Sequence, residues 1–535
     1  MFEQVLDPMH SVGLTALVAL VPVILLLVLL AVYRMTAWLA TLIGAVVTLG
    51  LALWVWHVPF SNALMACVYG SATGVWAVDW ITFWGVIIFN TLVMTGVFGD
   101  FQKWLTANAT ADVRVQAILL AWAFGALLEG LVGFGYPWAV VAPLLIALGI
   151  RDLDAIRVAA IANNAPVSFG ALGVPIIALA AVTGLPLMAL SASVGKIVAL
   201  LALVPPWVLI YLVAGKRGLR GAWPLAVVGS FAYIAGQFPV SQYLGPYLPD
   251  VTGAVVCFVA LLVLLRFWKP AETLGYGGVP ITEAPAHQTS AHGLSRRRVL
   301  AAWAPFFLLV AVVVLWTGPW SSLPAITLKG FEVEGISSLN HKVISASFAF
   351  TPFIGGTSIM ASWLLIALML RPGKLILKAV FRKTFTQMWG ALLVGVFIFA
   401  LAYIFNYSGM AASLAYTFSK LGVWFLVVAP ILGWIGVALS GSNTSTNAMF
   451  GAFQTMVGNL LGFPVLLAPS LNSVGAEVGK PIAPQTASVG VATTGYVRNE
   501  GEVIRHNMGW TLVLVACLIC IGLFYYFVLP GTMIR

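Results

Sequence analysis

Long stretches without charged side chains are the feature that most constrains this fold. The stretch from Val12 to Tyr33 contains no acidic or basic residue, and it is longer than the ~18 apolar residues that mark a membrane-spanning helix. Similar stretches recur along the 535-residue chain, which is 61% hydrophobic and only 8% charged, whereas a soluble domain is about one quarter charged. The ten-residue alternation typical of membrane strands is not apparent. We therefore expect an all-α polytopic membrane protein.

We predict about twelve transmembrane helices, together with two apolar segments that break in the middle. The helices are expected at about 12–33, 36–58, 79–98, 155–180, 188–214, 222–240, 247–268, 299–317, 343–370, 387–407, 468–493 and 508–530. The two broken segments, at about 116–149 and 420–462, contain glycine and polar residues at their centres, so we interpret them as re-entrant helical hairpins. Irregular backbone at that depth is tolerated only where protein or a water-filled cavity covers it.

The basic residues give this topology an orientation. Of the 26 lysines and arginines, 20 fall in loops on one side of the predicted membrane and 4 on the other; the richer side is expected to be cytoplasmic. The basic residues behind the net charge of +10 therefore serve to orient the chain in the membrane, and they do not suggest nucleic-acid binding. Both termini are expected outside. The chain then divides into a first inverted repeat (1–214), an extra helix pair with a cytoplasmic loop (215–298) and a second inverted repeat (299–535). Residues 275–298 are predicted to form a flexible loop.

Two distant stretches resemble each other and suggest this internal repeat. At one offset of 309 positions Asn163 aligns with Asn472, and Gly170 aligns with Gly479. In both copies, small, helix-breaking, hydroxyl- and amide-containing residues interrupt apolar sequence. In transporters with inverted repeats, discontinuous helices of this kind form a binding site near the membrane midplane. We therefore expect two hairpin tips and two broken helices to meet in the interior.

The candidate substrate-binding residues are the small and polar residues at these interruptions. They are Gly133, Gly135, Asn163, Asn164, Ser168, Ser442, Asn443, Thr444, Ser445, Asn447, Lys480 and Gln485. Hydroxyl and amide groups can bind a ligand or cap a helix N-terminus, and glycine allows close approach of the backbone. Lys480 offers a positive partner for an anionic substrate, as helix N-termini also do.

Two carboxyl groups are candidates for proton coupling. Glu129 lies near the break of the first hairpin, among apolar residues, where an ionised carboxylate is costly. Glu477 lies three residues before Lys480, and residues at this spacing are neighbours on a helix, so these two could instead form a structural ion pair. Asp79 lies at the predicted start of a helix, and we expect it to cap that helix on the outer side.

Other function classes find little support in the sequence. No glycine-rich phosphate-binding loop is present, which argues against direct ATP coupling, and no Cys/His cluster has the spacing of a metal site. We expect no cofactor, and no nucleophile–base set indicates an enzyme. The alternatives that stay open are a sodium-coupled carboxylate or dicarboxylate carrier and an anion channel.

These motifs resemble those of the L-lactate permease family of bacterial secondary transporters. The resemblance extends over nearly the whole chain and is carried by EGLVGFGYP (129–137), IANNAPVSFGALGVPI (161–176), SGSNTSTNAMF (440–450) and GKPIAPQ (479–485). The chain departs from the family at Asn443, where an aspartate often stands. The tripeptide Ser442-Asn443-Thr444 is also similar to the sodium-site signature of related sodium–dicarboxylate carriers, which keeps sodium coupling as an alternative.

The resemblance implies a transporter of the bacterial inner membrane. It implies uptake of L-lactate, with D-lactate and glycolate as further substrates, by symport with a proton. The expected partners are a small 2-hydroxy monocarboxylate, a proton and the lipid bilayer, without nucleic acid. Whether the protein forms a homodimer is left open.

Overall fold

Helices dominate the computed structural model, which describes residues 2–108, 110–133, 135–281, 295–323, 326–328, 330, 332–492 and 499–534. Within these ranges, ten helical segments are long and apolar enough to cross a membrane, or eleven if one bent pair counts as a single span. The expected all-α polytopic class is therefore confirmed. Most of the loop predicted at 275–298 lies outside the described residues, which stop at 281 and resume at 295.

The first part of the chain carries one short strand and thirteen helices. In chain order they are β1 (Phe2–Glu3), α1 (Val12–Ala31), α2 (Ala37–Trp54), α3 (Phe60–Thr73), α4 (Trp80–Met94), α5 (Val97–Asn108), α6 (Val113–Gln116), α7 (Gly125–Leu131), α8 (Tyr136–Ala147), α9 (Asp152–Ala162), α10 (Gly170–Thr183), α11 (Leu187–Leu201), α12 (Pro205–Tyr243) and α13 (Pro249–Phe267). Two π-helical turns, 74–79 and 117–124, join α3 to α4 and α6 to α7.

The second part of the chain is likewise mostly helical. It contains α14 (Arg296–Thr317), β2 (Glu332–Ile336), β3 (Val343–Ser347), α15 (Gly355–Leu370), α16 (Lys374–Ser408), α17 (Met410–Ser419), α18 (Phe425–Ser440), α19 (Asn443–Leu460), α20 (Leu467–Gly479), α21 (Pro484–Ala492) and α22 (Glu500–Phe527).

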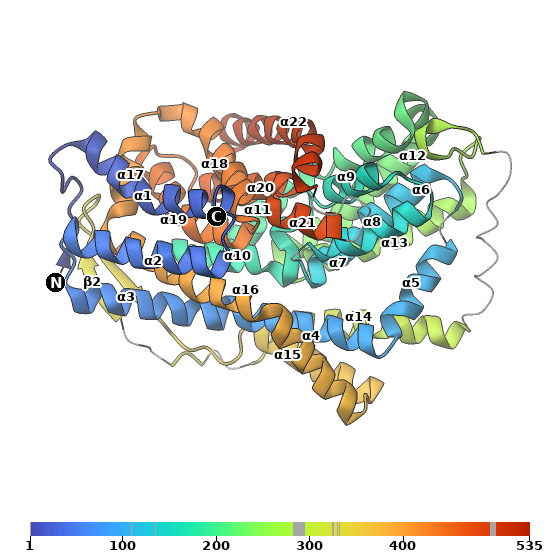
Figure 1. The fold of residues 1–535 in the computed structure, drawn as a ribbon, viewed down its shortest axis with the longest axis horizontal. Helices are drawn as coiled ribbons and strands as arrows, with labels where there is room; N and C mark the ends of the chain where they lie inside the picture. The colour runs from blue at the N-terminus through green and yellow to red at the C-terminus, as the bar shows by residue number, and fades with distance from the viewer. Residues whose placement is uncertain are drawn as a thin grey trace.

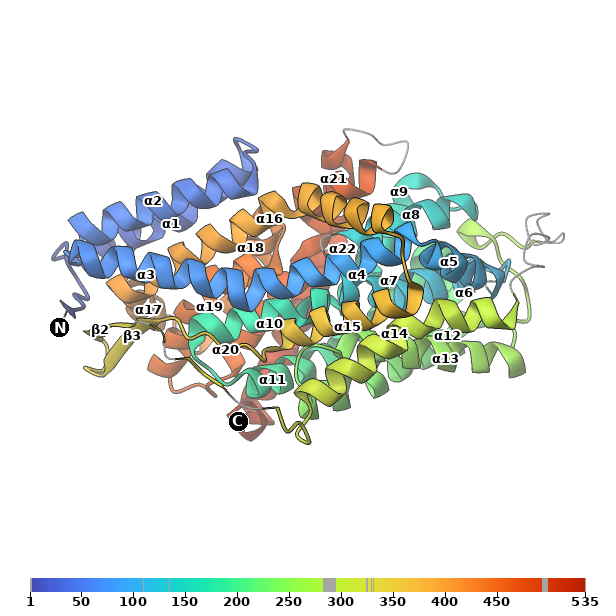
Figure 2. The ribbon, with the colours of Figure 1, turned by 90° about the horizontal axis from the view of Figure 1, so that it is seen from below.

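Two long rods, α3–α4 and α16, run side by side through the middle of the molecule (Figures 1 and 2). Each covers 35 residues. They approach closely, because a Cβ on Gly70 or Gly74 would overlap the backbone of α16; contacts through small residues are typical of helix packing in membranes. The helix predicted at 79–98 is therefore wrong at its start. The small and polar residues of α3 that allow this contact also make its sequence look like a loop.

The first hairpin, α6–α7 with α8, has both of its ends at the same place. At one end Arg114 donates a hydrogen bond to the carbonyl oxygen of Glu272 (2.7 Å), and at the other Arg151 donates to Tyr276 Oη (3.0 Å). Because Glu272 and Tyr276 belong to one short segment, the two ends lie together, as a re-entrant hairpin requires. The first arm, 113–131, is fully buried by other helices, so protein covers the break at its tip.

The second hairpin consists of α18 and α19. At the tip, Gly441 has φ +73°, a left-handed conformation that favours glycine. The Ser442 hydroxyl accepts a hydrogen bond from the backbone N–H of Ser445 (3.2 Å) and so caps α19. At the other end, Phe425 and Phe453 both contact the ring of Phe418. In Figure 1 this hairpin lies left of centre and the first hairpin lies right of centre.

A broken helix follows each hairpin. The pair α9–α10 bends by 67°, and its interruption at 163–169 lies inside the span predicted at 155–180. In the other half α20 ends at Gly479, a 3₁₀ turn covers Lys480–Ile482, and α21 begins at Pro484. Both interruptions leave irregular backbone and helix termini in the centre of the molecule.

A small three-stranded sheet, ordered β1-β2-β3, lies at one end of the helices. The strands β1 and β2 are parallel, and β2 pairs antiparallel with β3, with Val333 opposite Ala346. The helix predicted at 343–370 is wrong at its start, because residues 343–347 form β3 and α15 begins only at Gly355. Alternating apolar and polar residues in this segment favour a strand.

Candidate functional site

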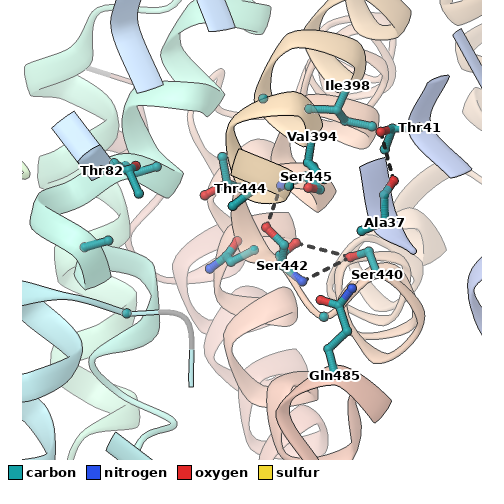
Figure 3. A pocket seen from close by; sticks show the side chains of 18 of the residues that line it. Ala37, Thr41, Thr82, Val394, Ile398, Ser440, Ser442, Thr444, Ser445 and Gln485 are labelled. Carbon is teal, nitrogen blue, oxygen red and sulfur yellow. Dashed lines mark hydrogen bonds between the residues drawn. The ribbon is translucent and has the colours of Figure 1, made fainter. Parts of the chain in front are cut away.

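A cavity of about 600 Å³ lies where the hairpin tips, the broken helices and the long rods meet (Figure 3). Three groups of elements form its walls: α1 and α2 on one side, the α3–α4 rod and α16 on a second, and the tips and interruptions on a third. The polar residues that line it are Thr36, Thr41, Asp79, Thr82, Glu129, Gln387, Ser440, Ser442, Asn443, Thr444, Ser445, Lys480, Gln485 and Thr486.

A buried ion pair connects the first hairpin to the second broken helix. Lys480 Nζ lies 2.6 Å from Glu129 Oε1, and the two residues are only 6% and 2% exposed. Asn163 holds the other oxygen, because its Nδ2 donates to Glu129 Oε2 at 2.9 Å. A Cβ on Gly170 would lie 2.6 Å from Glu129 Oε1, so a residue without a side chain is needed there. The pair therefore joins 129 and 480, which are far apart in the sequence, at the cavity wall.

The predicted pairing of Glu477 with Lys480 is wrong. The backbone stays helical up to Lys480, whose N–H donates to the carbonyl oxygen of Glu477, but the ammonium group of Lys480 pairs with Glu129. Glu477 Oε2 instead accepts a hydrogen bond from the backbone N–H of Ser168 at 3.0 Å. Glu477 is fully buried behind the cavity, whereas Glu129 lines it.

Amide side chains join the second hairpin to both broken helices. Asn472 Nδ2 donates to Asn447 Oδ1, and Gln454 Nε2 donates to Asn472 Oδ1, both at 2.9 Å. Asn447 Nδ2 donates in turn to the carbonyl oxygen of Pro175, also at 2.9 Å. These bonds connect α19, which begins at the tip, to both α20 and α10.

The structure separates the predicted substrate-binding residues into two groups. One group lines the cavity: Gly133, Ser442, Asn443, Thr444, Ser445, Lys480 and Gln485. The other lies behind it: Gly135, Asn163, Asn164, Ser168 and Asn447. The second group supports the first, since Asn163 holds Glu129, Asn447 anchors the tip, and Gly135 packs against Thr486.

Several buried polar atoms around the cavity have no hydrogen-bond partner in the described part of the chain. They include Asn443 Oδ1, Glu477 Oε1, Asn163 Oδ1 and both amide atoms of Asn164. Buried polar atoms in native proteins nearly always form hydrogen bonds, and of these residues Asn443 lines the cavity, so its oxygen is the one suited to a polar ligand. Within the described ranges, no group of three or more His, Cys, Asp or Glu side chains is arranged to hold a metal ion.

The sequence analysis missed the wall formed by the α3–α4 rod. Asp79 and Thr82 line the cavity there. The prediction that Asp79 caps a helix on the outer side is wrong, because α3 and α4 form one rod and Asp79 lies near its middle, in a π-helical turn. Such turns are frequent at functional sites. A lone carboxyl group inside an apolar span was the signal that could have identified it.

Comparison with known proteins gives matches over the full length. The model of the L-lactate permease family matches residues 15–529. Glycolate permease GlcA of Escherichia coli K12 is 33% identical over 100% of this chain and 99% of that protein. L-lactate permease of Bacillus subtilis is 33% identical over 95% of each chain, and that of E. coli K12 is 31% identical over 97% of each chain.

Proposed function

Because the chain belongs to the L-lactate permease family, we propose that it takes up L-lactate, D-lactate and glycolate by proton symport. It is a multi-pass transporter of the bacterial plasma membrane and not an enzyme. Its relatives are named as lactate and glycolate permeases. A cavity that holds one lysine among hydroxyl and amide groups suits a small 2-hydroxy monocarboxylate.

The ion pair between Glu129 and Lys480 is the observation that carries this proposal. In the structure the two opposite charges lie 2.6 Å apart and neutralise each other. A substrate carboxylate that enters the cavity competes with Glu129 for the ammonium group of Lys480. When the substrate takes this position, Glu129 loses its counter-charge, and an unpaired carboxylate at this depth is costly.

Proton uptake by Glu129 relieves that cost. One substrate anion and one proton then enter the site together, and the loaded cavity gains no net charge. Asn163 keeps Glu129 in position during the exchange of partners, since it binds the oxygen that does not face Lys480. The unpaired Asn443 oxygen and the hydroxyl groups of the second tip supply further hydrogen bonds to the substrate.

We also propose that the chain consists of two inverted repeats, 1–214 and 299–535, with residues 215–298 between them. Each contains a 35-residue rod, then a short helix, a hairpin and a broken helix. A hydrogen bond joins Ser168 to Glu477, and these residues are 309 positions apart, which is the repeat offset. Residues related by a two-fold axis meet each other only near that axis. The two-fold axis then passes beside the cavity. Tilting the two halves in one direction or the other therefore opens the cavity to one side of the membrane or the other.

Uptake by purified protein in proteoliposomes tests the proposed function. Labelled L-lactate should accumulate under an inward proton gradient without sodium, and unlabelled lactate or glycolate inside the vesicles should drive counterflow. Uptake that requires a sodium gradient and ignores a proton gradient would instead support the sodium-coupled alternative. Large currents without counterflow would support an anion channel.

A further inference from the structure

Asp79 is a carboxyl group of the cavity wall that the proposed coupling does not use. It lines the cavity and is only 7% exposed, and its Oδ2 has no hydrogen-bond partner among the residues that the structure describes. No lysine or arginine of the described ranges lies within ion-pair distance of it. An unpaired acceptor so deeply buried at a cavity wall indicates a ligand contact.

The helices around Asp79 leave room for its carboxyl group but place no charged side chain next to it. Both carboxyl oxygens occupy the space over Gly395 of α16, where a Cβ would overlap them. From 384 to 402, α16 contains no ionisable side chain, and neither do α4 and α10. On α3 the only ionisable groups are Cys67 and Tyr69. Across the cavity the charged groups are Glu129 and Lys480, which already pair with each other.

An ionised Asp79 is therefore incompatible with an anionic substrate in the same cavity. Like charges in one buried cavity repel strongly, and Lys480, which takes the substrate carboxylate, leaves no cation to compensate Asp79. A proton on Asp79 removes this repulsion and also removes the cost of a buried, unpaired charge. A neutral carboxyl group both donates and accepts hydrogen bonds, and so does the hydroxyl group of a 2-hydroxy acid.

We infer that Asp79 is a substrate-binding residue that acts in its protonated form and hydrogen-bonds the 2-hydroxyl group of the substrate. The inference rests on the proposed function, in which Lys480 takes the substrate carboxylate and leaves the hydroxyl group as the remaining polar group. Asp79 then distinguishes lactate from an acid of the same length without the hydroxyl group.

Two substitutions at this position separate the protonated form from the ionised one. Asp79→Asn keeps a neutral group of the same shape that can donate and accept, whereas Asp79→Leu keeps the branched side chain with the same number of heavy atoms but forms no hydrogen bonds. Gly395→Ala is a second way to disturb the contact, because its methyl group displaces the carboxyl group and leaves Asp79 itself unchanged. Asp100→Leu, which removes an aspartate of α5 outside the cavity lining, is the matched control.

Binding of lactate and of propionate, which lacks the 2-hydroxyl group, is measured by calorimetry on each purified variant, with lactate counterflow in proteoliposomes beside it. Asp79→Leu and Gly395→Ala should weaken lactate binding roughly tenfold, the worth of about one hydrogen bond, and leave propionate binding unchanged. Asp79→Asn and the control should keep the preference for lactate and the counterflow.

Retention of the full lactate preference in Asp79→Leu would overturn this inference but not the proposed function. Loss of binding and counterflow in Asp79→Asn, with normal yield of folded protein, would show that the ionised form is needed and would also overturn it. Wild-type protein that binds neither acid would overturn the proposed function and this inference with it.

Discussion

At the scale of single residues, the central feature is a charged pair that only the folded chain brings together. Glu129 and Lys480 come from different halves and are almost completely buried. A buried pair of this kind adds little net stability, since desolvation offsets the attraction, but loss of one partner leaves an uncompensated charge. The pair is therefore suited to a change of partner, in which the substrate replaces Glu129 on Lys480.

Substitution of Glu129 should separate substrate movement from proton movement. Glu129→Gln has the shape of the protonated residue, so lactate counterflow should continue while accumulation driven by a proton gradient is lost. Labelled-lactate uptake in proteoliposomes, with and without a proton gradient, measures both activities. Normal accumulation in this variant would exclude Glu129 as the proton carrier.

Substitution of Lys480 alone should destabilise the protein more than substitution of Lys480 and Glu129 together. Lys480→Met leaves Glu129 buried without a counter-charge and should lower the unfolding free energy by about 3 kcal/mol or more. The double variant Glu129→Gln with Lys480→Met restores a neutral site and should recover most of that loss. Thermal unfolding of the purified variants checks this, and an unimproved double variant would contradict the pairing.

Much of the site at residue scale was predictable, and the misses have physical reasons. Glu129, Lys480 and the second tip stand out because charged and polar groups are costly in apolar sequence. The pairing of Lys480 with Glu129 was not predictable, because it depends on a contact between distant parts of the chain. Asp79 is a carboxyl group in apolar sequence, as Glu129 is. The sequence nevertheless predicts that Asp79 starts a helix, because the small and polar residues of α3 do not stand out as part of a membrane span.

At the scale of elements, the contact between α3–α4 and α16 decides the shape of one cavity wall. Gly70 and Gly74 bring the backbones together, and the π-helical turn that begins at Gly74 ends at Asp79. Sequence periodicity located the apolar rods, but it did not distinguish a loop from the glycine- and serine-containing half of a rod. The interruptions were easier to locate, since asparagine, proline and glycine cluster there.

A methyl group at this contact should loosen the wall. Gly74→Ala places a Cβ 2.5 Å from the carbonyl oxygen of Gly395, so the rods must separate, at a cost of about 1–3 kcal/mol. Gly99→Ala on α5 is the control, because nothing lies within 4 Å of its added Cβ. Thermal unfolding should show a lower midpoint for Gly74→Ala alone. Equal midpoints for the two variants would contradict the close contact.

At the scale of the whole molecule, the account depends on two halves that enclose one cavity. The class of the fold followed from composition and from the length of the apolar stretches, whereas the sheet and the true helix starts required the structure. The division into inverted repeats stays a proposal, supported by the matching order of elements and by the Ser168–Glu477 contact.

Simultaneous measurement of proton and lactate entry tests the central claim most directly. Wild-type proteoliposomes that contain a pH-sensitive dye should take up one proton for each labelled lactate, and an imposed membrane potential should not change the rate. Lactate entry without proton entry, or a rate that follows the membrane potential, would contradict the exchange of partners at Glu129 and Lys480.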